Sequence, residues 1–311
     1  MGTDTAVVFP GMGPTRFADV AKFMLINPQA RRLTRTADET LGYSLVDRYR
    51  DTPGDYSEYA QLAFLVNSLA LAEWVEQTQG VRGGICAGPS FGGKAAAVYS
   101  GALSFPDAVR MTSRWARVLE DYFAVEHRDI VVQSFARVPE LIRAELLREL
   151  DEEGEWYDIA CHIDHDLTMV CLREGRLEWF QRRVRAHGGL PLYVMRPPMH
   201  SQAFTALRDR VEAEILDVLT FADPTIPVVA DQDGRMLTTG PEVRAMLLDG
   251  FVRAVHWPQV VQSLRERGVD KVYVCGSDSL FGRVHCTTAA FEVVTADPRL
   301  ALRPQRRGMA A

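Results

Sequence analysis

Two short segments contain residue types suited to nucleophilic catalysis. The first, GPSFG at residues 88–92, matches the G-x-S-x-G nucleophile elbow, in which a strained strand-to-helix turn exposes a serine hydroxyl. Its glycines let the chain pass close to itself, and the helix that follows directs its positive end toward an oxyanion formed at the serine. The pattern predicts Ser90 as a nucleophile; the alternative is an ordinary glycine turn.

A serine nucleophile needs a general base, and the seven histidines are the candidates. His200 follows the segment RPPM at residues 196–199 and directly precedes a predicted helix. A short loop between regular elements is suited to aiming an imidazole ring. From position alone, a catalytic role and a helix-capping role for His200 are equally supported.

The segment HIDHD at residues 162–166 raises the question of a metal site. Alternation along a strand places His162, Asp164 and Asp166 on one face. A closed metal site needs further ligands, and none is nearby in the sequence. We therefore expect a solvated hairpin there and no bound metal.

The elements that position Ser90 follow an α/β pattern. A short apolar strand at residues 6–9 ends at Pro10 and Gly11, and residues 61–75 have apolar positions all the way round a helix, which predicts a buried helix. An apolar segment ending at Ala87 leads into the serine turn and an alanine-rich helix from Gly93. Ser104 begins another helix, which continues to residue 122.

Between residues 126 and 196 the predicted order is β-α-β-β-α-β, which is typical of a ferredoxin-like unit. The predicted elements there are strand 130–135, helix 139–150, strands 157–163 and 167–172, helix 177–187 and strand 190–195. After His200 we expect a helix to residue 219, a strand at 226–230, helices at 242–251 and 257–267, and a strand at 271–275.

The predicted fold class is therefore α/β, with a large α/β-hydrolase-like domain that contains a parallel sheet and is interrupted by a ferredoxin-like subdomain. The predicted boundaries are residues 1–125 and 197–297 for the large catalytic domain, 126–196 for the subdomain and 298–311 for a solvated C-terminal extension.

The charge, the cysteine content and the lack of long apolar runs argue against several classes of function. The 311 residues carry 35 Lys and Arg against 41 Asp and Glu, and a net charge of -6 disfavours binding to nucleic acid or to an anionic membrane. The five scattered cysteines indicate free thiols of a reducing compartment. No signal peptide and no apolar run of about 18 residues is evident, so we expect a cytoplasmic protein. We also expect it to be a monomer.

The sequence resembles the malonyl-CoA:acyl carrier protein transacylase family, which includes the acyltransferase domains of polyketide synthases. Four segments carry the resemblance in the family's order: VVFPGMG at residues 7–13, QLAFLVNSLAL at 61–71, GPSFGG at 88–93 and PPMHS at 197–201. The resemblance implies a ping-pong scheme without a bound cofactor, in which a serine takes an acyl group from a phosphopantetheine thioester, on coenzyme A or a carrier protein, and passes it to an acyl carrier protein.

The resemblance also implies a role for each matching residue. Ser90 would be the nucleophile and His200 the general base and acid. The backbone N–H groups of Met12 and Phe91 would form the oxyanion hole, and the backbone carbonyl of Gly250 would orient the histidine in place of a triad carboxylate.

Departures from the family's motifs concern the substrate. Malonyl enzymes place an arginine 25 positions after the serine to bind the malonyl carboxylate, and this sequence has Trp115 there. The elbow histidine is replaced by Pro89, and the specificity segment is PPMH at residues 197–200, with Met199 before the base. The family's asparagine and glutamine of the hairpin are replaced by Ile163 and Leu167. These changes favour an acyl group without a free carboxylate.

Among the family's members, the sequence is most similar to discrete, trans-acting enzymes that move an aminoacyl or dipeptidyl group between carrier proteins in macrolactam polyketide pathways. Three alternatives remain open at this stage: an acyl carrier protein thioester hydrolase that clears stalled carriers, a malonyl-CoA:acyl carrier protein transacylase, and a non-catalytic scaffold. Carrier proteins are acidic, so arginines near the site are candidate docking residues, and the sequence offers Arg182, Arg185, Arg196 and Arg299.

Overall fold

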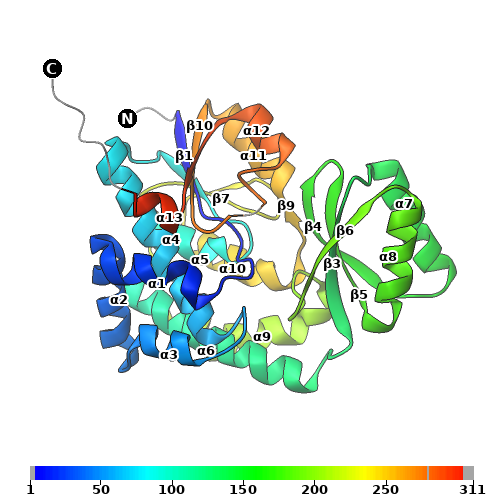
Figure 1. Cartoon of the computed structure of the whole chain (residues 1–311), viewed down its shortest axis with the longest axis horizontal. Helices are drawn as coiled ribbons and strands as arrows, with labels where there is room; N and C mark the ends of the chain where they lie inside the picture. The colour runs from blue at the N-terminus through cyan, green and yellow to red at the C-terminus, as the bar shows by residue number, and fades with distance from the viewer. Residues whose placement is uncertain (1–3, 279, 304–311) are drawn as a thin grey trace.

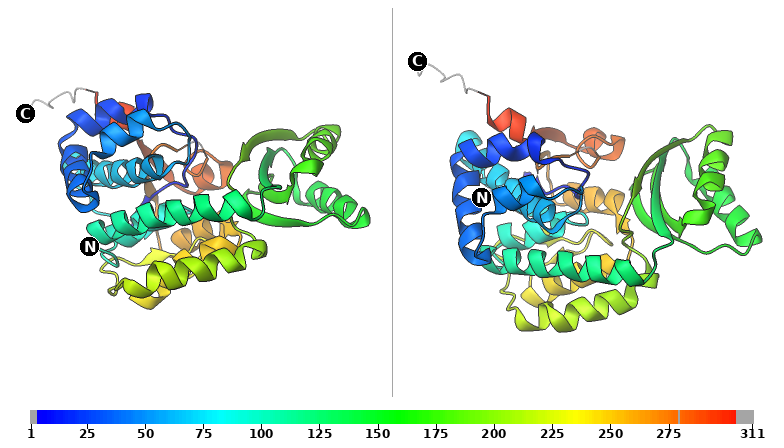
Figure 2. Two further views of the ribbon diagram at one scale, coloured as in Figure 1. Left: turned by 90° about the horizontal axis from the view of Figure 1, so that it is seen from below. Right: turned by 60° about the horizontal axis from the view of Figure 1, so that its bottom comes forward.

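The computed structural model of the chain describes residues 4–278 and 280–303. A large α/β domain and a smaller sheet domain lie side by side, and the smaller one is formed by the middle of the sequence (Figure 1). The same separation is visible from two further directions (Figure 2). The predicted fold class is confirmed: a large α/β domain is interrupted by a smaller one. The chain leaves the large domain after α6 (Phe105–Val125) and returns to it after β6 (Leu190–Met195).

Six strands form the sheet of the large domain, in the order β11 (Glu292–Ala296), β10 (Lys271–Cys275), β1 (Thr5–Val8), β2 (Ile85–Ala87), β7 (Val228–Val229) and β8 (Met236–Leu237). Neighbouring strands are parallel except β7 and β8. Successive residues Val7 and Val8 point to opposite faces and both are buried, so both faces of the sheet are covered. The carboxyl ends of β1, β2 and β7 meet at one edge, where ligand sites of such sheets form.

Helix α4 (Glu58–Gln79) forms the centre of the large domain. Every residue from Ala60 to Ala72 is buried, as predicted from its all-round apolar pattern. Ser57 caps its start by accepting a hydrogen bond from the N–H of Ala60, and Gly80 ends it in the left-handed conformation. The other helices of this domain are α1 (Phe17–Ile26), α2 (Pro28–Leu41), α3 (Leu45–Asp51), α5 (Gly92–Tyr99), α6 (Phe105–Val125), α9 (Thr205–Glu214), α10 (Gly240–Val252), α11 (Trp257–Glu266), α12 (His285–Ala290) and α13 (Pro298–Ala301).

The small domain has the ferredoxin-like arrangement. Its elements are β3 (Ile130–Ala136), α7 (Glu140–Glu152), β4 (Tyr157–Asp164), β5 (Leu167–Arg173), α8 (Leu177–Ala186) and β6 (Leu190–Met195), and its strands are antiparallel in the order β6-β3-β5-β4. Phe135 and Phe180 meet edge to face, 5.3 Å apart, in a core separate from that of the large domain.

The two domains share one sheet contact. Strand β9 (Val255–His256), which belongs to the returning chain, pairs in parallel with β4 and so extends the small-domain sheet. In this pairing the rings of His162 and His256 stack, with centroids 4.2 Å apart. Burial lowers the pKa of His162 to about 4, so the pair is packed as neutral rings.

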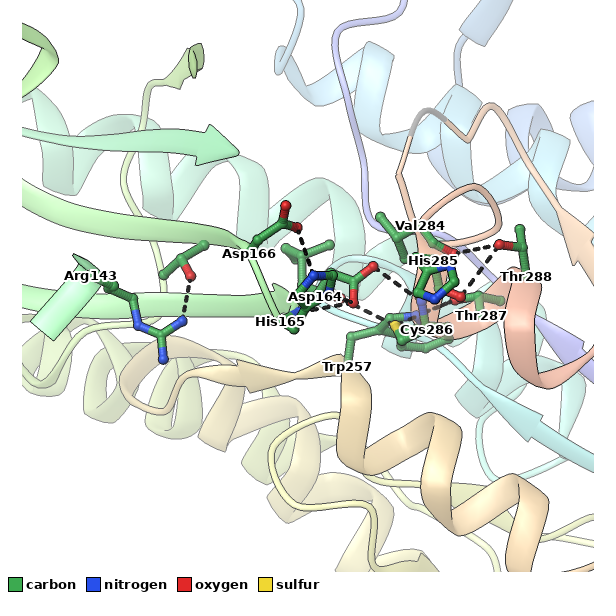
Figure 3. Close-up of polar contacts among 12 residues, drawn as sticks. Arg143, Asp164, His165, Asp166, Trp257, Val284, His285, Cys286, Thr287 and Thr288 are labelled. Atoms are coloured by element: carbon green, nitrogen blue, oxygen red, sulfur yellow. Dashed lines mark hydrogen bonds and ion pairs between the residues drawn. The ribbon is translucent and has the colours of Figure 1, made fainter. Parts of the chain in front are cut away.

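The hairpin at residues 162–166 forms a second contact between the domains (Figure 3). One carboxylate oxygen of Asp164 accepts the N–H of His165 (2.8 Å), and the other accepts the N–H of Cys286 in α12 (3.1 Å). The prediction of a solvated hairpin was wrong for Asp164, which is 6% exposed. His162, Asp164 and Asp166 do not form a cluster of metal ligands. Within the described ranges, the one cluster of possible ligands close enough to share an ion is Glu145, Glu149 and His187.

Two other predictions differ from the structure. The helix expected from residue 200 to 219 is interrupted, because Ile215 leaves helical backbone angles after α9. Residues 298–301 do not extend into solvent but form α13, since Asp297 caps its start and Arg299 forms an ion pair with Asp19 of α1 (3.2 Å). The rest of the predicted extension, residues 304–311, lies outside the described residues. Over the part of the chain that is described, no helix is both long and apolar enough to span a membrane.

Candidate active site

Ser90 lies at a sharp turn between β2 and α5, at the carboxyl edge of the parallel sheet. Its φ of +55° is in the left-handed region, which is strained for a residue with a side chain and recurs at functional sites. Two glycines make the turn possible. A Cβ on Gly88 would lie 2.2 Å from the carbonyl oxygen of Gly92, and one on Gly92 would lie 1.9 Å from that of Phe9.

The structure brings His200 to Ser90 across 110 positions of sequence. Oγ of Ser90 lies 2.9 Å from Nε2 of His200, which is hydrogen-bonding distance. His200 also has a left-handed backbone, with φ of +65°, in the loop that follows β6. In this arrangement the imidazole can take the proton of the serine hydroxyl and thereby raise its nucleophilicity.

The loop of His200 is fastened to both domains through the next residue. The N–H of Ser201 donates to the carbonyl of Phe251 in the large domain (3.0 Å), and its hydroxyl donates to the carboxylate of Asp158 in the small domain. These bonds fix the backbone from which the imidazole projects.

His200 is 3% exposed. Burial lowers its pKa to about 4, and the backbones of Arg253 and Gly250 oppose this effect weakly. Gly250 therefore lies beside the imidazole as the resemblance implied, but Nδ1 makes no hydrogen bond of regular geometry with any described residue. A neutral imidazole at neutral pH is the form that accepts a proton.

This low pKa predicts an unusual pH profile. Because the imidazole is neutral above about pH 4, the rate at which a fluorophosphonate modifies Ser90 should stay level from pH 8 to about pH 5 and fall by half near pH 4. The second-order rate constant, measured by intact mass between pH 4 and 8, tests this. A midpoint near 6.5, the value of an exposed histidine, would contradict the prediction.

Asp231 is a group at this site that was not predicted from the sequence. It follows β7 and is 3% exposed, and its Oδ2 accepts the N–H of Ser90 at 2.7 Å. Burial raises the pKa of Asp231 to about 7, while the bond from Ser90 opposes that shift. The carboxyl group thereby holds the strained backbone of the elbow, so Asp231 is a positioning residue.

We expect Asp231→Ala to lower kcat/KM for acyl transfer by about 10- to 100-fold and the free energy of unfolding by about 1–3 kcal/mol, because the N–H of Ser90 loses its buried acceptor. Asp231→Asn keeps an acceptor oxygen at this position and should recover most of both losses. Steady-state kinetics and urea unfolding of the two variants provide the measurement. Equal damage in both variants would show that the hydrogen bond is not what matters.

Met12 and Phe91 lie beside Ser90 on the cavity wall. Met12 follows β1 and Phe91 directly precedes α5, so both backbones come from the carboxyl edge of the sheet. Among the hydrogen bonds of the described residues, none uses the backbone N–H of either residue. Two free N–H groups beside a nucleophile are what an oxyanion hole requires.

The cavity that opens from Ser90 is mostly apolar, with Trp115 in its wall. The indole is 5% exposed and stacks on Phe251, with centroids 4.7 Å apart and planes 17° apart. Met199 also lines the cavity. Two predicted lining residues do not: Pro89 is buried within the elbow, and Ile163 is fully buried, with its carbonyl facing the thiol of Cys286. These two assignments are corrected: Pro89 is buried in the turn itself and Ile163 packs into the hydrophobic core, so neither lines the cavity.

The arginines next to Trp115 in sequence point away from the cavity. Arg114 donates to the carbonyl of Glu214 (2.6 Å), and Arg117 forms a two-point ion pair with Glu58 (2.8 and 2.9 Å). The basic side chain that does line the cavity is Lys94, in the first turn of α5. The sequence analysis did not single it out, although a lone charged residue between glycine and three alanines is a signal of an unusual buried group.

The four candidate docking arginines are not brought together. Arg182 and Arg185 lie on α8, on the side of the small domain away from the large one (Figure 1). Arg299 lies on α13 of the large domain, and Arg196 directly precedes Pro197, which lines the cavity. Arg196 is therefore the one of the four that stands next to the cavity wall.

Comparison with known proteins agrees with this geometry. Residues 134–195 match the family model of the VinK acyltransferase small domain. Over 283 residues the chain is 26% identical to the malonyl CoA-acyl carrier protein transacylase of Escherichia coli (strain K12), covering 88% of this chain and 89% of that protein. The chain is an acyl carrier protein acyltransferase that is similar, over most of its length, to malonyl-CoA:acyl carrier protein transacylases.

Solved structures show the same fold for this acyltransferase. FabD from Acinetobacter baumannii superposes with a TM-score of 0.84 at 20% identity, over 97% of this chain and 96% of that one. A malonyl-transacylase in complex with its type II polyketide synthase acyl-carrier protein superposes with a TM-score of 0.83 at 20% identity, over 96% and 99% of the two chains. The fold is thus shared along nearly the whole length.

Proposed function

We propose that this acyltransferase moves an acyl group without a free carboxylate, such as an aminoacyl or dipeptidyl group, onto or between acyl carrier proteins of a polyketide pathway. The observation that carries the proposal is the wall of the acyl cavity: Trp115 lines it, and neither Arg114 nor Arg117 reaches it. The resemblance assigns the family's carboxylate-binding arginine to the position of Trp115. The names of the relatives support an acyl carrier protein as the partner.

The proposed reaction has two half-reactions. In the first, Nε2 of His200 takes the proton of Ser90 while Oγ attacks the thioester carbonyl, and the backbone N–H groups of Met12 and Phe91 bind the oxyanion. Collapse of the tetrahedral intermediate breaks the C–S bond, and His200 returns its proton to the departing phosphopantetheine thiolate. In the second half-reaction, His200 takes the proton of the acceptor carrier's thiol while the sulfur attacks the acyl-Ser90 ester. Collapse of this intermediate breaks the bond between the acyl carbon and Oγ, and His200 returns the proton to Oγ of Ser90.

A second candidate function is malonyl transfer, because the relatives named above are malonyl transacylases. In that case a malonyl carboxylate would lie against Trp115, and a guanidinium clamp would be replaced by an indole that has one N–H donor and no charge. This loss of a bidentate ionic contact is why we place the non-carboxylate substrate first.

Intact-mass analysis of the protein after brief incubation with thioester donors tests the proposal. Pantetheine thioesters of N-acylaminoacyl and alkanoyl groups should add one acyl mass to the wild type within minutes, and malonyl-CoA should do so at least about 100-fold more slowly. Transfer of the label to an added carrier protein separates an acyltransferase from a hydrolase. Malonylation as fast as, or faster than, loading from the other donors would overturn the proposal.

A further inference from the structure

Lys94 is a buried cation for which the fold gives no partner. Its side chain is 4% exposed, and it lines the same cavity as Ser90 and Trp115. Across residues 4–278 and 280–303, no hydrogen bond or ion pair involves Nζ of Lys94. Its near neighbours are two aromatic rings, with Nζ lying 4.6 Å from the ring centre of Phe91 and 4.4 Å from that of Trp115.

This placement is costly for folding. Lysine is rarely buried without a carboxylate, and the first turn of a helix disfavours positive charge. Burial lowers the pKa of Lys94 to about 7, which shows how poorly the site solvates the ammonium group. Two cation–π contacts recover part of the cost. A methionine would fill the same space at a lower cost in folding free energy. The amine is therefore accounted for only if it interacts with a ligand that enters the cavity.

We propose that Nζ of Lys94 donates a hydrogen bond to an amide carbonyl oxygen in the acyl chain, and so selects acyl groups in which the amine of the thioester-linked amino acid is acylated, dipeptidyl groups included, over aminoacyl groups in which that amine is free. The inference rests on the proposed function and refines it, because it chooses between an acyl group with a free amine and one whose nitrogen is already acylated.

The surroundings of Lys94 favour a neutral acceptor. Phe91 and Trp115 cover two sides of the amine, so it offers few N–H groups to a ligand. The side-chain amides of Gln61 and Gln232 also line the cavity, but each already donates to a backbone carbonyl, that of Tyr56 (2.9 Å) and that of Met246 (3.2 Å). A desolvated carboxylate needs several donors, whereas a single N–H satisfies an amide carbonyl.

In its protonated form Lys94 also opposes a free amine on the thioester-linked amino acid. The ammonium group of such an aminoacyl chain would bring a second cation into the mostly apolar cavity near Lys94, where repulsion is screened less than in water. N-acylation of that amine removes the charge and supplies the carbonyl acceptor in one step. Both effects select in the same direction.

The test compares Lys94→Met with the wild type on matched pantetheine thioesters. N-acetylglycyl and pentanoyl thioesters have chains of the same length and differ in the amide, and the glycyl thioester carries the free amine. The rate of Ser90 acylation is followed by intact mass for each donor. We expect the ratio of N-acetylglycyl to pentanoyl acylation to fall by about 10- to 100-fold in Lys94→Met, and the glycyl thioester to gain relative to pentanoyl.

Ratios within one variant cancel any general loss of activity. Arg114→Met is the matched control, since Arg114 lies one residue from Trp115 but points to Glu214 at the surface, and its ratios should equal those of the wild type. Lys94→Met should melt no lower than the wild type, because it removes a buried amine.

The outcomes separate the two proposals. Equal ratios in wild type and Lys94→Met, or no N-acetylglycyl loading at all, would overturn the role of Lys94 and leave the non-carboxylate function standing. Rapid loading from malonyl-CoA that is lost in Lys94→Met would show that Lys94 binds a carboxylate, and would overturn both the amide preference and the proposed function.

Discussion

Replacing Ser90 with alanine should abolish acyl transfer. The hydroxyl is the atom that forms the ester, it lies 2.9 Å from Nε2 of His200, and no other described hydroxyl is hydrogen-bonded to that imidazole. Loss of a nucleophile that acts together with its base lowers the rate by a factor on the order of 10⁴ or more. Acyl adducts should be absent by intact mass, and transfer to a carrier protein should fall to background.

Alanine and serine experience similar strain at the φ of +55° that Ser90 adopts, so the fold should be unaffected. Circular dichroism and thermal unfolding check this. Ser277→Ala is a matched control outside the acyl cavity and should retain full activity. An acyl adduct that persists in Ser90→Ala would move the nucleophile elsewhere and remove the basis of the proposed mechanism.

The second large effect is expected for His200→Asn. Asparagine tolerates the left-handed backbone of this position, so the loop should keep its course, but its side chain cannot act as a base. General base catalysis contributes about 10²- to 10⁴-fold, and we expect a loss of that size in both acylation of Ser90 and transfer to the acceptor thiol.

Single-turnover kinetics on an acyl donor and, separately, on preformed acyl-enzyme measure the two half-reactions. His285→Ala, at the exposed start of α12, serves as the control histidine. A loss confined to the first half-reaction would show that a different group deprotonates the acceptor thiol, and a loss below tenfold would exclude His200 as the base.

Local rules explain what the sequence could predict. The six elements of the small domain are short, each ends at a turn residue or charged segment, and their order alone specifies the arrangement that the structure shows. Ser90 was predictable because the chain passes so close to itself at Gly88 and Gly92 that neither position has room for a Cβ, and this requirement is visible in the sequence as two glycines. In these cases a few neighbouring residues carry the information.

The features of the site and fold that the sequence did not predict depend on contacts between segments far apart in the chain. Asp231 meets the N–H of Ser90 across 141 positions, and nothing near Asp231 in the sequence marks that pairing. The contact of Arg299 with Asp19, which lies 280 positions earlier in the chain, could not be predicted from the sequence around either residue. Ile163 was placed in the cavity through the resemblance to the family's hairpin motif, which does not show that in this chain the residue packs into the hydrophobic core.

His200 lies between the two domains, so the distance between its imidazole and Ser90 depends on how the domains are oriented. Ser90 is carried by the large domain, whereas the loop of His200 leaves β6 of the small domain and is tied to Phe251 on one side and Asp158 on the other. A displacement of about 1 Å at reacting groups costs roughly 100-fold in rate. A change in the angle between the domains that separated Oγ of Ser90 from Nε2 of His200 would therefore lower the rate of acylation, and the parallel β4–β9 pairing holds the domains in the arrangement in which the two atoms are in contact.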